Sequence, residues 1–310
     1  MVRVRLGRSG LEVSPICHGT WQLSPRFWGE QPRELMIAAA RKAFDVGVNF
    51  FDTADAYGDG LAEEVLGEAL RPLPRDQIIL ATKVYHHFYP GGRRHPDLSG
   101  KYVEQECEVS LGRLQMDYID LYQCHAFDPL TDLAETTAAL ERLKQAGKIR
   151  AYGASNFTVE QLRAARRFGD YATLQPRYNL LQSQAEADLL PYCRAEDIGV
   201  LAYSSLYHGL LTGKYAGTET FADLRKSNAD FQGERFQQLA GRVRALGPLA
   251  EKCSLSIVQL VLVVTLMSPM IHSAIIGIKK PEQIVEAAGA MGKTISREDY
   301  FEVRAALGSA

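Results

Sequence analysis

The sequence predicts an α/β protein built as a (β/α)8 barrel, and three observations lead to that prediction. Eight short apolar runs follow one another along the chain, and longer segments with the 3.6-residue period of an amphipathic helix lie between them. Most of the short runs are apolar throughout, which is typical of strands buried on both faces of a parallel sheet. The 310 residues divide into eight units of about 39 residues each, a length that fits a closed barrel with long loops.

The expected elements follow one another in a regular order. Residues 1–14 form two alternating runs around Arg8-Ser9-Gly10, so we expect an N-terminal β-hairpin. The eight expected strands are residues 16–20, 49–53, 78–83, 118–125, 149–155, 173–175, 200–203 and 273–278. The expected helices are residues 33–46, 61–70, 102–114, 133–145, 159–168, 187–196, two segments between residues 235 and 267, and residues 283–290.

An open, doubly wound sheet is the alternative architecture for alternating strands and helices. Such a sheet would normally carry a Gly-x-Gly-x-x-Gly turn after a strand. Gly58-Asp59-Gly60 begins that pattern, but Glu63 stands where the third glycine belongs. The segment 209–214 resembles a P-loop, yet it is one residue short and lacks the hydroxyl residue after its lysine, which argues against phosphoryl transfer. We therefore predict one barrel domain over residues 1–310.

The composition excludes several classes of protein. Lys plus Arg number 35 and Asp plus Glu number 37, and this net charge of −2 argues against nucleic-acid binding driven by overall charge. The N-terminus lacks the apolar core of a signal peptide. The most apolar stretch, residues 257–278, is interrupted by polar residues and Pro269, so it is a poor membrane span. Five cysteines without a CxxC pair indicate reduced thiols. We expect a cytoplasmic protein with no membrane or nucleic-acid partner.

Polar residues stand at the ends of several predicted strands, where the active sites of barrel enzymes lie. Asp52 and then Tyr57 follow the second strand, Lys83 ends the third and His125 ends the fourth. Further polar positions are Ser155 and Asn156 after the fifth strand, Gln175 in the sixth, and Tyr203 and Ser204 after the seventh. Each residue alone has an ordinary explanation as a turn, a cap or a packing residue. Four ionisable or proton-donating groups at the ends of three successive strands point instead to a shared site.

These residue types suit acid catalysis at a carbonyl group. A lysine cation beside a phenol favours the phenolate and lowers the pKa of the tyrosine, an aspartate can hold the lysine, and a histidine can hydrogen-bond a carbonyl oxygen. Two other chemistries remain open. Asp52 and Asp55 could act as the carboxylate pair of a glycosidase, although that gives Lys83 no role. A zinc hydrolase would need several histidines at strand ends, where His125 stands alone, so no metal ligand is predicted.

The order of these motifs resembles the aldo-keto reductases, a barrel family that uses NADPH without a Rossmann domain. The resemblance runs nearly end to end and is carried by LGRSGLEVSPICHGTW, FFDTADAYG, ILATKV, DYIDLYQCHAFDP, GKIRAYGASNF, LQPRYNLL, YSSLYHGLLTGKY and IIGIKKPEQIVEAA. It is greatest to bacterial members with the GLLTGK loop, among them general-stress reductases. It implies hydride transfer from NADPH to an aldehyde or ketone, and an N-terminal hairpin that caps the bottom of the barrel. Asp52, Tyr57, Lys83 and His125 match the catalytic tetrad, with Tyr57 as general acid.

The resemblance also implies cofactor contacts. The matching positions are Gly19, Thr20 and Trp21 with Asp52 beside the cofactor, Ser155, Asn156 and Gln175 at the carboxamide, Tyr203 on the nicotinamide ring, Ser204, Leu206 and Lys214 at the pyrophosphate, and Gly277, Lys279, Gln283 and Glu286 at the adenosine phosphate. Lys279 stands where arginine is usual. A cation there can pair with a 2′-phosphate, so we expect NADPH to be favoured over NADH. This sequence differs from the usual family pattern at Cys17-His18, Ser205, His208 and Ala287.

The expected substrate is a small carbonyl compound bound by the long loops. Trp21, Tyr57, Tyr85 and His125 are the expected substrate-binding residues, and the loops are residues 85–100 and 215–234. Arg93-Arg94 raises the question of an anionic substrate. Two other functions remain open: a cofactor-binding regulatory subunit resembling the potassium-channel β subunits, and a sugar isomerase or glycosidase barrel. We expect a monomer or a weak homo-oligomer.

Overall fold

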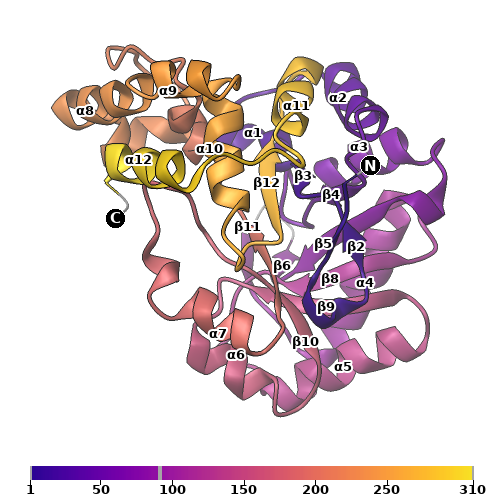
Figure 1. The fold of residues 1–310 in the computed structure, drawn as a ribbon. Helices are drawn as coiled ribbons and strands as arrows, with labels where there is room; N and C mark the ends of the chain where they lie inside the picture. The colour runs from indigo at the N-terminus through magenta and orange to yellow at the C-terminus, as the bar shows by residue number, and fades with distance from the viewer. Residues whose placement is uncertain (1, 90–92, 309–310) are drawn as a thin grey trace.

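Eight parallel strands close into a barrel in the computed structural model, which describes residues 2–89 and 93–308 (Figure 1). Each strand is hydrogen-bonded to two neighbours, and the last strand pairs with the first. In pairing order the strands are β3 (Ile16–Gly19), β4 (Phe50–Asp52), β5 (Ile79–Val84), β8 (Ile119–Cys124), β9 (Ile149–Ser155), β10 (Tyr171–Gln175), β11 (Gly199–Ala202) and β12 (Ser273–Gly277). This arrangement confirms the predicted (β/α)8 barrel.

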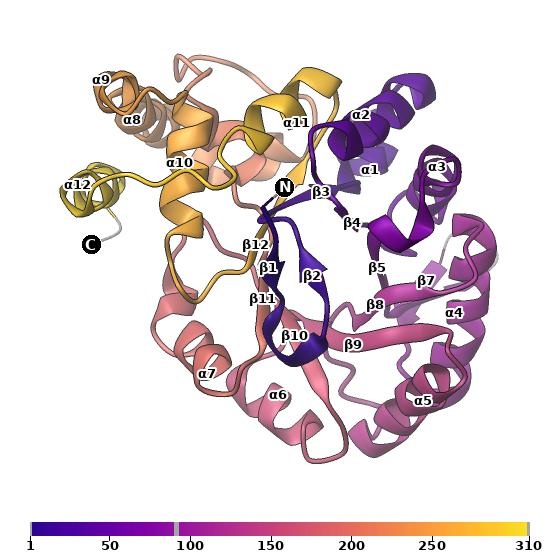
Figure 2. The same ribbon diagram turned by 45° about the vertical axis from the view of Figure 1, so that its right-hand side comes forward.

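Helices lie in the connections between these strands and surround the barrel, as Figures 1 and 2 show. These helices include α2 (Arg33–Asp45), α3 (Leu61–Leu70), α4 (Gly100–Leu114), α5 (Leu133–Gln145), α6 (Val159–Ala165), α7 (Leu189–Ala195), α10 (Ile257–Leu266) and α11 (Pro281–Ala288). Thr158 and Ser256 begin α6 and α10 with capping boxes, which satisfy backbone N–H groups that a helix start leaves free.

Each barrel strand divides its side chains between the helices and the barrel interior, because successive residues of a strand point to opposite faces. Phe51 and Leu80 face outward and belong to the largest core cluster, which they share with the surrounding helices. Phe50 and Ala81, their neighbours along the strands, face inward and belong to a smaller inner cluster. The barrel is therefore filled by side chains rather than open along its axis.

The N-terminal hairpin closes one end of this inner cluster. β1 (Val4–Arg5) pairs antiparallel with β2 (Glu12–Val13), as the sequence predicts. Leu6, Leu11 and Val13 are buried against the inward-facing side chains of the barrel. Figure 2 shows the hairpin lying across the ring of strands.

The loop after β5 contains a second hairpin that the sequence pattern did not reveal. β6 (His86–Tyr89) pairs antiparallel with β7 (Arg93–Pro96), and residues 90–92 of this predicted loop lie outside the described residues. Its strands carry histidine, tyrosine and arginine, so no apolar run marked them. A single helical turn, α1 (Pro25–Trp28), also follows β3.

The C-terminal third is more helical than predicted. Three helices, α8 (Gly233–Arg244), α9 (Gly247–Lys252) and α10, replace the two expected segments, because Gly247-Pro248 starts a new helix. A further helix, α12 (Arg297–Leu307), follows the last predicted one and is capped by Ser296. Within the described residues no single helix has the length and apolar character to cross a membrane. Residues 233–252 and 257–266 meet that test only as a pair, bent by 85°.

The buried hairpin predicts a stability effect. Leu6→Ala empties part of the inner cluster and should lower the free energy of unfolding by about 2–5 kcal/mol, because a buried leucine loses its packing and leaves a cavity. Leu130→Ala is the matched control: Leu130 is 92% exposed, and its loss should change stability by less than about 0.5 kcal/mol. Urea unfolding measures both. Equal effects would show that the hairpin does not stabilise the barrel.

Candidate active site

Strand alternation brings two charged residues into the barrel interior. Ile79 and Ala81 of β5 belong to the inner cluster, so Lys83, two residues after Ala81, also points inward. Phe50 of β4 belongs to the same cluster, so Asp52, two residues after Phe50, points inward as well. Both side chains lie at the carboxyl ends of their strands and are buried, Lys83 with 0% and Asp52 with 2% exposure. A buried lysine needs a partner, and Asp52 provides it.

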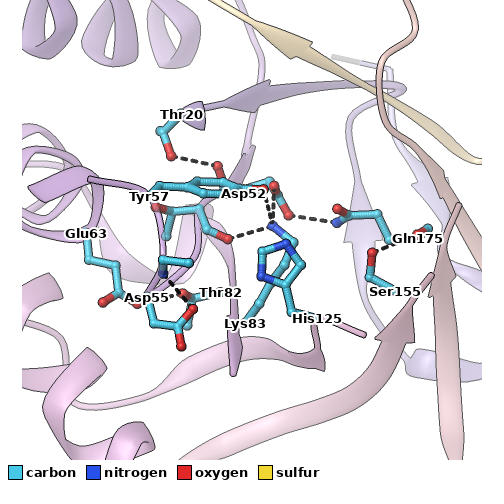
Figure 3. A network of polar contacts seen from close by, with 12 residues as sticks. Thr20, Asp52, Asp55, Tyr57, Glu63, Thr82, Lys83, His125, Ser155 and Gln175 are labelled. Atoms are coloured by element: carbon cyan, nitrogen blue, oxygen red, sulfur yellow. Dashed lines mark hydrogen bonds and ion pairs between the residues drawn. The ribbon is translucent and has the colours of Figure 1, made fainter. Parts of the chain in front are cut away.

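Three oxygen atoms surround the ammonium group of Lys83 (Figure 3). Its Nζ donates hydrogen bonds to Oδ2 of Asp52 at 2.7 Å, to the carbonyl of Thr53 at 2.7 Å and to the hydroxyl of Tyr57 at 3.3 Å. These three acceptors satisfy all three donors of an ammonium group. Oδ1 of Asp52 accepts a further hydrogen bond of 2.8 Å from Nε2 of Gln175, so Asp52 also joins β4 to β10 across the barrel.

Burial and charge act in opposite directions on the proton-carrying groups. Burial opposes the charged form of Lys83, but the charge of Asp52 and the hydrogen bonds to Asp52 and Tyr57 outweigh it and hold the pKa of the lysine above its usual value. Burial raises the pKa of Tyr57 to about 12, and the smaller effect of the Lys83 charge lowers it. Lys83 thus lowers the pKa of Tyr57 as the sequence predicts, but burial outweighs this effect and Tyr57 carries its proton near pH 7.

His125 lies beside the tyrosine. Its ring is edge-on to that of Tyr57, with centroids 5.8 Å apart and an interplanar angle of 78°. Burial, together with the charges of Lys83 and His86, holds the pKa of His125 well below its usual value. The imidazole is therefore neutral near pH 7 and can donate a hydrogen bond from one ring nitrogen. The four residues singled out in the sequence, Asp52, Tyr57, Lys83 and His125, thus lie together.

A cleft of about 700 Å³ opens above these residues at the carboxyl ends of the strands, a size typical of small-molecule sites. The wall includes all the predicted cofactor-binding positions, namely Gly19, Thr20, Trp21, Asp52, Ser155, Asn156, Gln175, Tyr203, Ser204, Leu206, Lys214, Gly277, Lys279, Gln283 and Glu286. Tyr57 and His125 line the same cleft, whereas Lys83 contacts it only through Tyr57 and Asp52.

Hydrogen bonds that meet at Asn156 fix one wall of the cleft. Asn156 has a φ of 58°, a left-handed conformation that asparagine tolerates better than most residues. Its Nδ2 donates to the carbonyl of His125 at 2.9 Å, and its Oδ1 accepts from the hydroxyl of Tyr203 at 2.8 Å. Ser155 donates to the carbonyl of Gln175 at 2.8 Å. Tyr203 is thereby held at the wall beside the tetrad.

Another part of the cleft is positively charged. Lys214, Arg225 and Lys279 line it together, and Asp223 beside them already pairs with Arg225 at 2.5 Å. Nζ of Lys279 lies 4.9 Å from the ring centroid of Trp28. Burial lowers the pKa of Lys279, and the charges of Arg225 and Lys214 add to that effect. Among the described residues of this part, three cations outnumber the carboxylates of Asp223 and Glu286, and the net positive charge favours the binding of an anion.

Two further features of this part fit a dinucleotide with its phosphates. The side-chain oxygens of Gln22 and Ser204 are buried and have no hydrogen-bond partner among the described residues. Tyr207, His208 and Gly209, which line the cleft, have φ values of 43°, 52° and 89°, so the chain makes a tight left-handed turn there. A nicotinamide dinucleotide offers anionic oxygens that accept from the Ser204 hydroxyl, and hydroxyl and amide donors for the side-chain oxygen of Gln22.

The chain matches the model of the aldo/keto reductase family over residues 15–307. It belongs to the aldo/keto reductase family. Among curated proteins it is 38% identical to the aldo-keto reductase YhdN of Bacillus subtilis (96% of this chain, 91% of that protein) and 33% identical to the NADH-specific methylglyoxal reductase of Escherichia coli (98% of each). It is also 33% identical to a probable voltage-gated potassium channel subunit beta of Oryza sativa (92% and 90%).

Solved structures of aldo/keto reductases share this fold. The glycerol dehydrogenase AKR11B4 of Gluconobacter oxydans superposes with a TM-score of 0.91 at 32% identity, covering 99% of this chain and 95% of its own. The aldo/keto reductase of Klebsiella pneumoniae, solved in complex with NADP and acetate, superposes with a TM-score of 0.77 at 32% identity, covering 97% and 93%.

Two expectations about this aldo/keto reductase differ from the structure. Tyr85 does not line the cleft, because it is half-buried against the outer core, and the next residue, His86, reaches the wall instead. Asp55 does not face Asp52 across the cleft. It is fully buried, and burial together with the charges of Glu63 and Glu106 raises the pKa of its carboxyl group well above the usual value. A carboxylate pair at the cleft is therefore not formed.

Some residues of the cleft were missed or left unassigned. His86 and Arg94 come from the hairpin that the sequence pattern did not reveal, and Gln22 and Arg177 follow no distinctive pattern. Arg225 was noted only as part of a long loop. Its cation near Lys214 was a usable signal, but nothing in the sequence showed that the loop returns to the cleft. Within the described residues, no three His, Cys, Asp or Glu side chains gather as metal ligands.

The buried Lys83–Asp52 pair predicts strong energetic coupling. Lys83→Met and Asp52→Asn should each destabilise the fold by about 3–5 kcal/mol, because each leaves one buried charge without its partner. The double variant should lower the free energy of unfolding by clearly less than the sum of the two single changes. Urea unfolding of the four proteins gives the coupling energy.

The pair Arg33–Glu68 is the control for that cycle. Its atoms also lie 2.7 Å apart, but both side chains are 44% exposed, so Arg33→Met with Glu68→Gln should show a coupling under about 1 kcal/mol. Similar coupling energies in the two cycles would contradict the buried pairing.

Proposed function

We propose that this protein reduces an aldehyde or ketone to an alcohol with NADPH as hydride donor and Tyr57 as general acid. The observation that carries the proposal is the 3.3 Å hydrogen bond from Lys83 to Tyr57, beneath a cleft that also holds His125. The methylglyoxal reductase and glycerol dehydrogenase names of two relatives describe carbonyl and alcohol chemistry and agree with this class.

Tyr57 is the residue that would donate the proton. With a pKa of about 12 its hydroxyl is protonated at neutral pH, so it can hydrogen-bond a carbonyl oxygen and then protonate the developing alkoxide. Once the proton has left, the nearby ammonium group of Lys83 stabilises the phenolate. Neutral His125 would donate a second hydrogen bond to the same oxygen and orient the carbonyl group.

The cofactor would lie along the wall that runs from Tyr203 to Lys279. A reduced nicotinamide supplies hydride when bound there. Ser155, Asn156 and Gln175 carry the amide and hydroxyl groups for its carboxamide, and the cations would hold its phosphates. Lys279 favours NADPH over NADH, because the 2′-phosphate of NADPH is an additional anion that the lysine ammonium group can bind. The relatives differ on this point, since one is named NADH-specific and another was solved with NADP.

The general-acid role predicts that Tyr57→Phe lowers kcat by at least about 100-fold, because general acid catalysis contributes that much. The measurement is NADPH oxidation with a panel of aldehydes and ketones. Quenching of protein fluorescence by NADPH should give a nearly unchanged Kd and so show that the variant still binds cofactor. Full turnover by Tyr57→Phe would refute the role, and an inactive wild type on the whole panel would refute carbonyl reduction.

The phosphate assignment predicts selectivity at Lys279. Lys279→Ala should raise the KM for NADPH about tenfold or more and leave that for NADH nearly unchanged, since only NADPH carries the additional anion. Lys280→Ala is the matched control, because Lys280 is exposed and does not line the cleft. Equal changes for the two cofactors would rule out a contact between Lys279 and the 2′-phosphate.

A cofactor-binding regulatory subunit is the second candidate function. It is favoured by the 33% identity to a probable voltage-gated potassium channel subunit beta. This reading requires slow turnover and a stable complex with a membrane protein. Affinity purification of the tagged chain from detergent-solubilised cells, beside the turnover assay, distinguishes it from the reductase.

A further inference from the structure

The β6–β7 hairpin presents different residues on its two faces. Side chains directly opposite each other in an antiparallel pair lie on one face, and successive residues alternate. Arg94 is opposite Phe88, and His86 is two residues before Phe88, so these three share a face. His87 and Tyr89 lie on the other face and stack on each other. Arg94 and His86 line the cleft, which identifies their face as the one turned toward it.

A row of rings runs from the reacting tyrosine to His86, which shares its hairpin face with Arg94. The ring centroids of Tyr57 and His125 are 5.8 Å apart, and those of His125 and His86 are 6.0 Å apart. Burial, and then the charge of Arg94, lower the pKa of His86 to about 4. His86 is therefore neutral near pH 7, and the positive charge on this side of the tetrad belongs to the guanidinium group of Arg94.

The ion pair that Arg94 makes is a weak one. Its Nη1 lies 3.5 Å from Oδ1 of Asp59, and the Arg94 side chain is 24% exposed whereas that of Asp59 is 71% exposed. An ion pair with an acid that is mostly in water contributes little. An anion inside the cleft would meet a guanidinium group that is largely removed from water, where the attraction between charges is stronger.

We propose that the carbonyl substrate carries an anionic oxyacid group, a carboxylate or a phosphate, and that Arg94 binds this group while the carbonyl lies at Tyr57 and His125. The inference rests on the proposed carbonyl reduction and adds the substrate class. A guanidinium group offers two parallel donors that match the oxygens of either anion. Asp59 then leaves Arg94 for water, to which it is already mostly exposed, so the exchange leaves no buried charge unpaired.

Pairs of aldehydes that differ mainly in charge test this inference. The first pair is 4-carboxybenzaldehyde and its methyl ester, and the second is glyceraldehyde 3-phosphate and glyceraldehyde, each assayed with saturating NADPH. The wild type should prefer at least one anion over its neutral counterpart by about tenfold or more in kcat/KM, the value of a hydrogen bond to a charged group. The pair that shows the preference identifies the anion as carboxylate or phosphate.

Arg94→Gln should remove that preference by raising the KM for the anionic aldehyde about 10- to 100-fold, with the neutral aldehyde changed less than about twofold. Activity on the neutral aldehyde also shows that the variant is folded. Arg93→Gln is the matched control, because Arg93 is exposed and does not line the cleft. Asp59→Asn should lower the KM for the anion, since it removes the competing carboxylate.

Three results would overturn the inference. These are equal reduction of both members of each pair by the wild type, a preference for the neutral members, or an equal loss on both members in Arg94→Gln. In each case the neutral aldehydes are still reduced, so the proposed carbonyl reduction stands. Failure of the proposed function looks different, because none of the four compounds would then oxidise NADPH.

Discussion

The buried ammonium group of Lys83 is the constraint on which the rest of the site depends. A charge inside an otherwise apolar barrel is stable only when every donor finds an acceptor, and the acceptors here come from one short segment, residues 52–57. The chain that follows β4 must therefore wrap around Nζ of Lys83, so that each of the three oxygens comes within hydrogen-bonding distance of it. That turn sets the place of the Tyr57 hydroxyl, and the bond from Gln175 to Asp52 ties the same turn to the opposite wall.

Besides Arg177 and Glu286, charged side chains among the described residues of the cleft gather in three places. The Lys83–Asp52 pair lies at the base, Arg94 on the side of the β6–β7 hairpin, and Lys214, Arg225 and Lys279 on the side of the long C-terminal loops. Burial keeps the intervening imidazoles of His86 and His125 neutral by lowering their pKa values. A ligand with a neutral reacting centre and an anionic group at each end matches this distribution.

The sequence alone predicts those elements that are marked by a pattern of neighbouring residues. The barrel strands are apolar runs, and the residues that end β4 and β5 point inward by simple alternation, so the fold and most of the cleft wall could be predicted. Tyr85 and Arg94 show the limit. Their loop forms a hairpin without an apolar run, and the face it turns to the cleft depends on a register that only the structure gives. The lowering of the Tyr57 pKa by Lys83 could be predicted, whereas the larger effect of burial, which raises that pKa, depends on the structure.

The pairing of β12 with β3 has a consequence for synthesis. It brings together segments from opposite ends of the chain. In one example, the hydroxyl of Ser273 donates a hydrogen bond to the carbonyl of Ser14, 259 positions away in the sequence. Until β12 leaves the ribosome, β3 and β11 are unpaired edges, and such edges are templates for association with other chains. Contacts this distant also form slowly. The growing chain therefore carries an open edge at β3 through most of its translation, joined by the edge of β11 once residues 199–202 have emerged, and this is the interval in which aggregation and chaperone capture compete with folding.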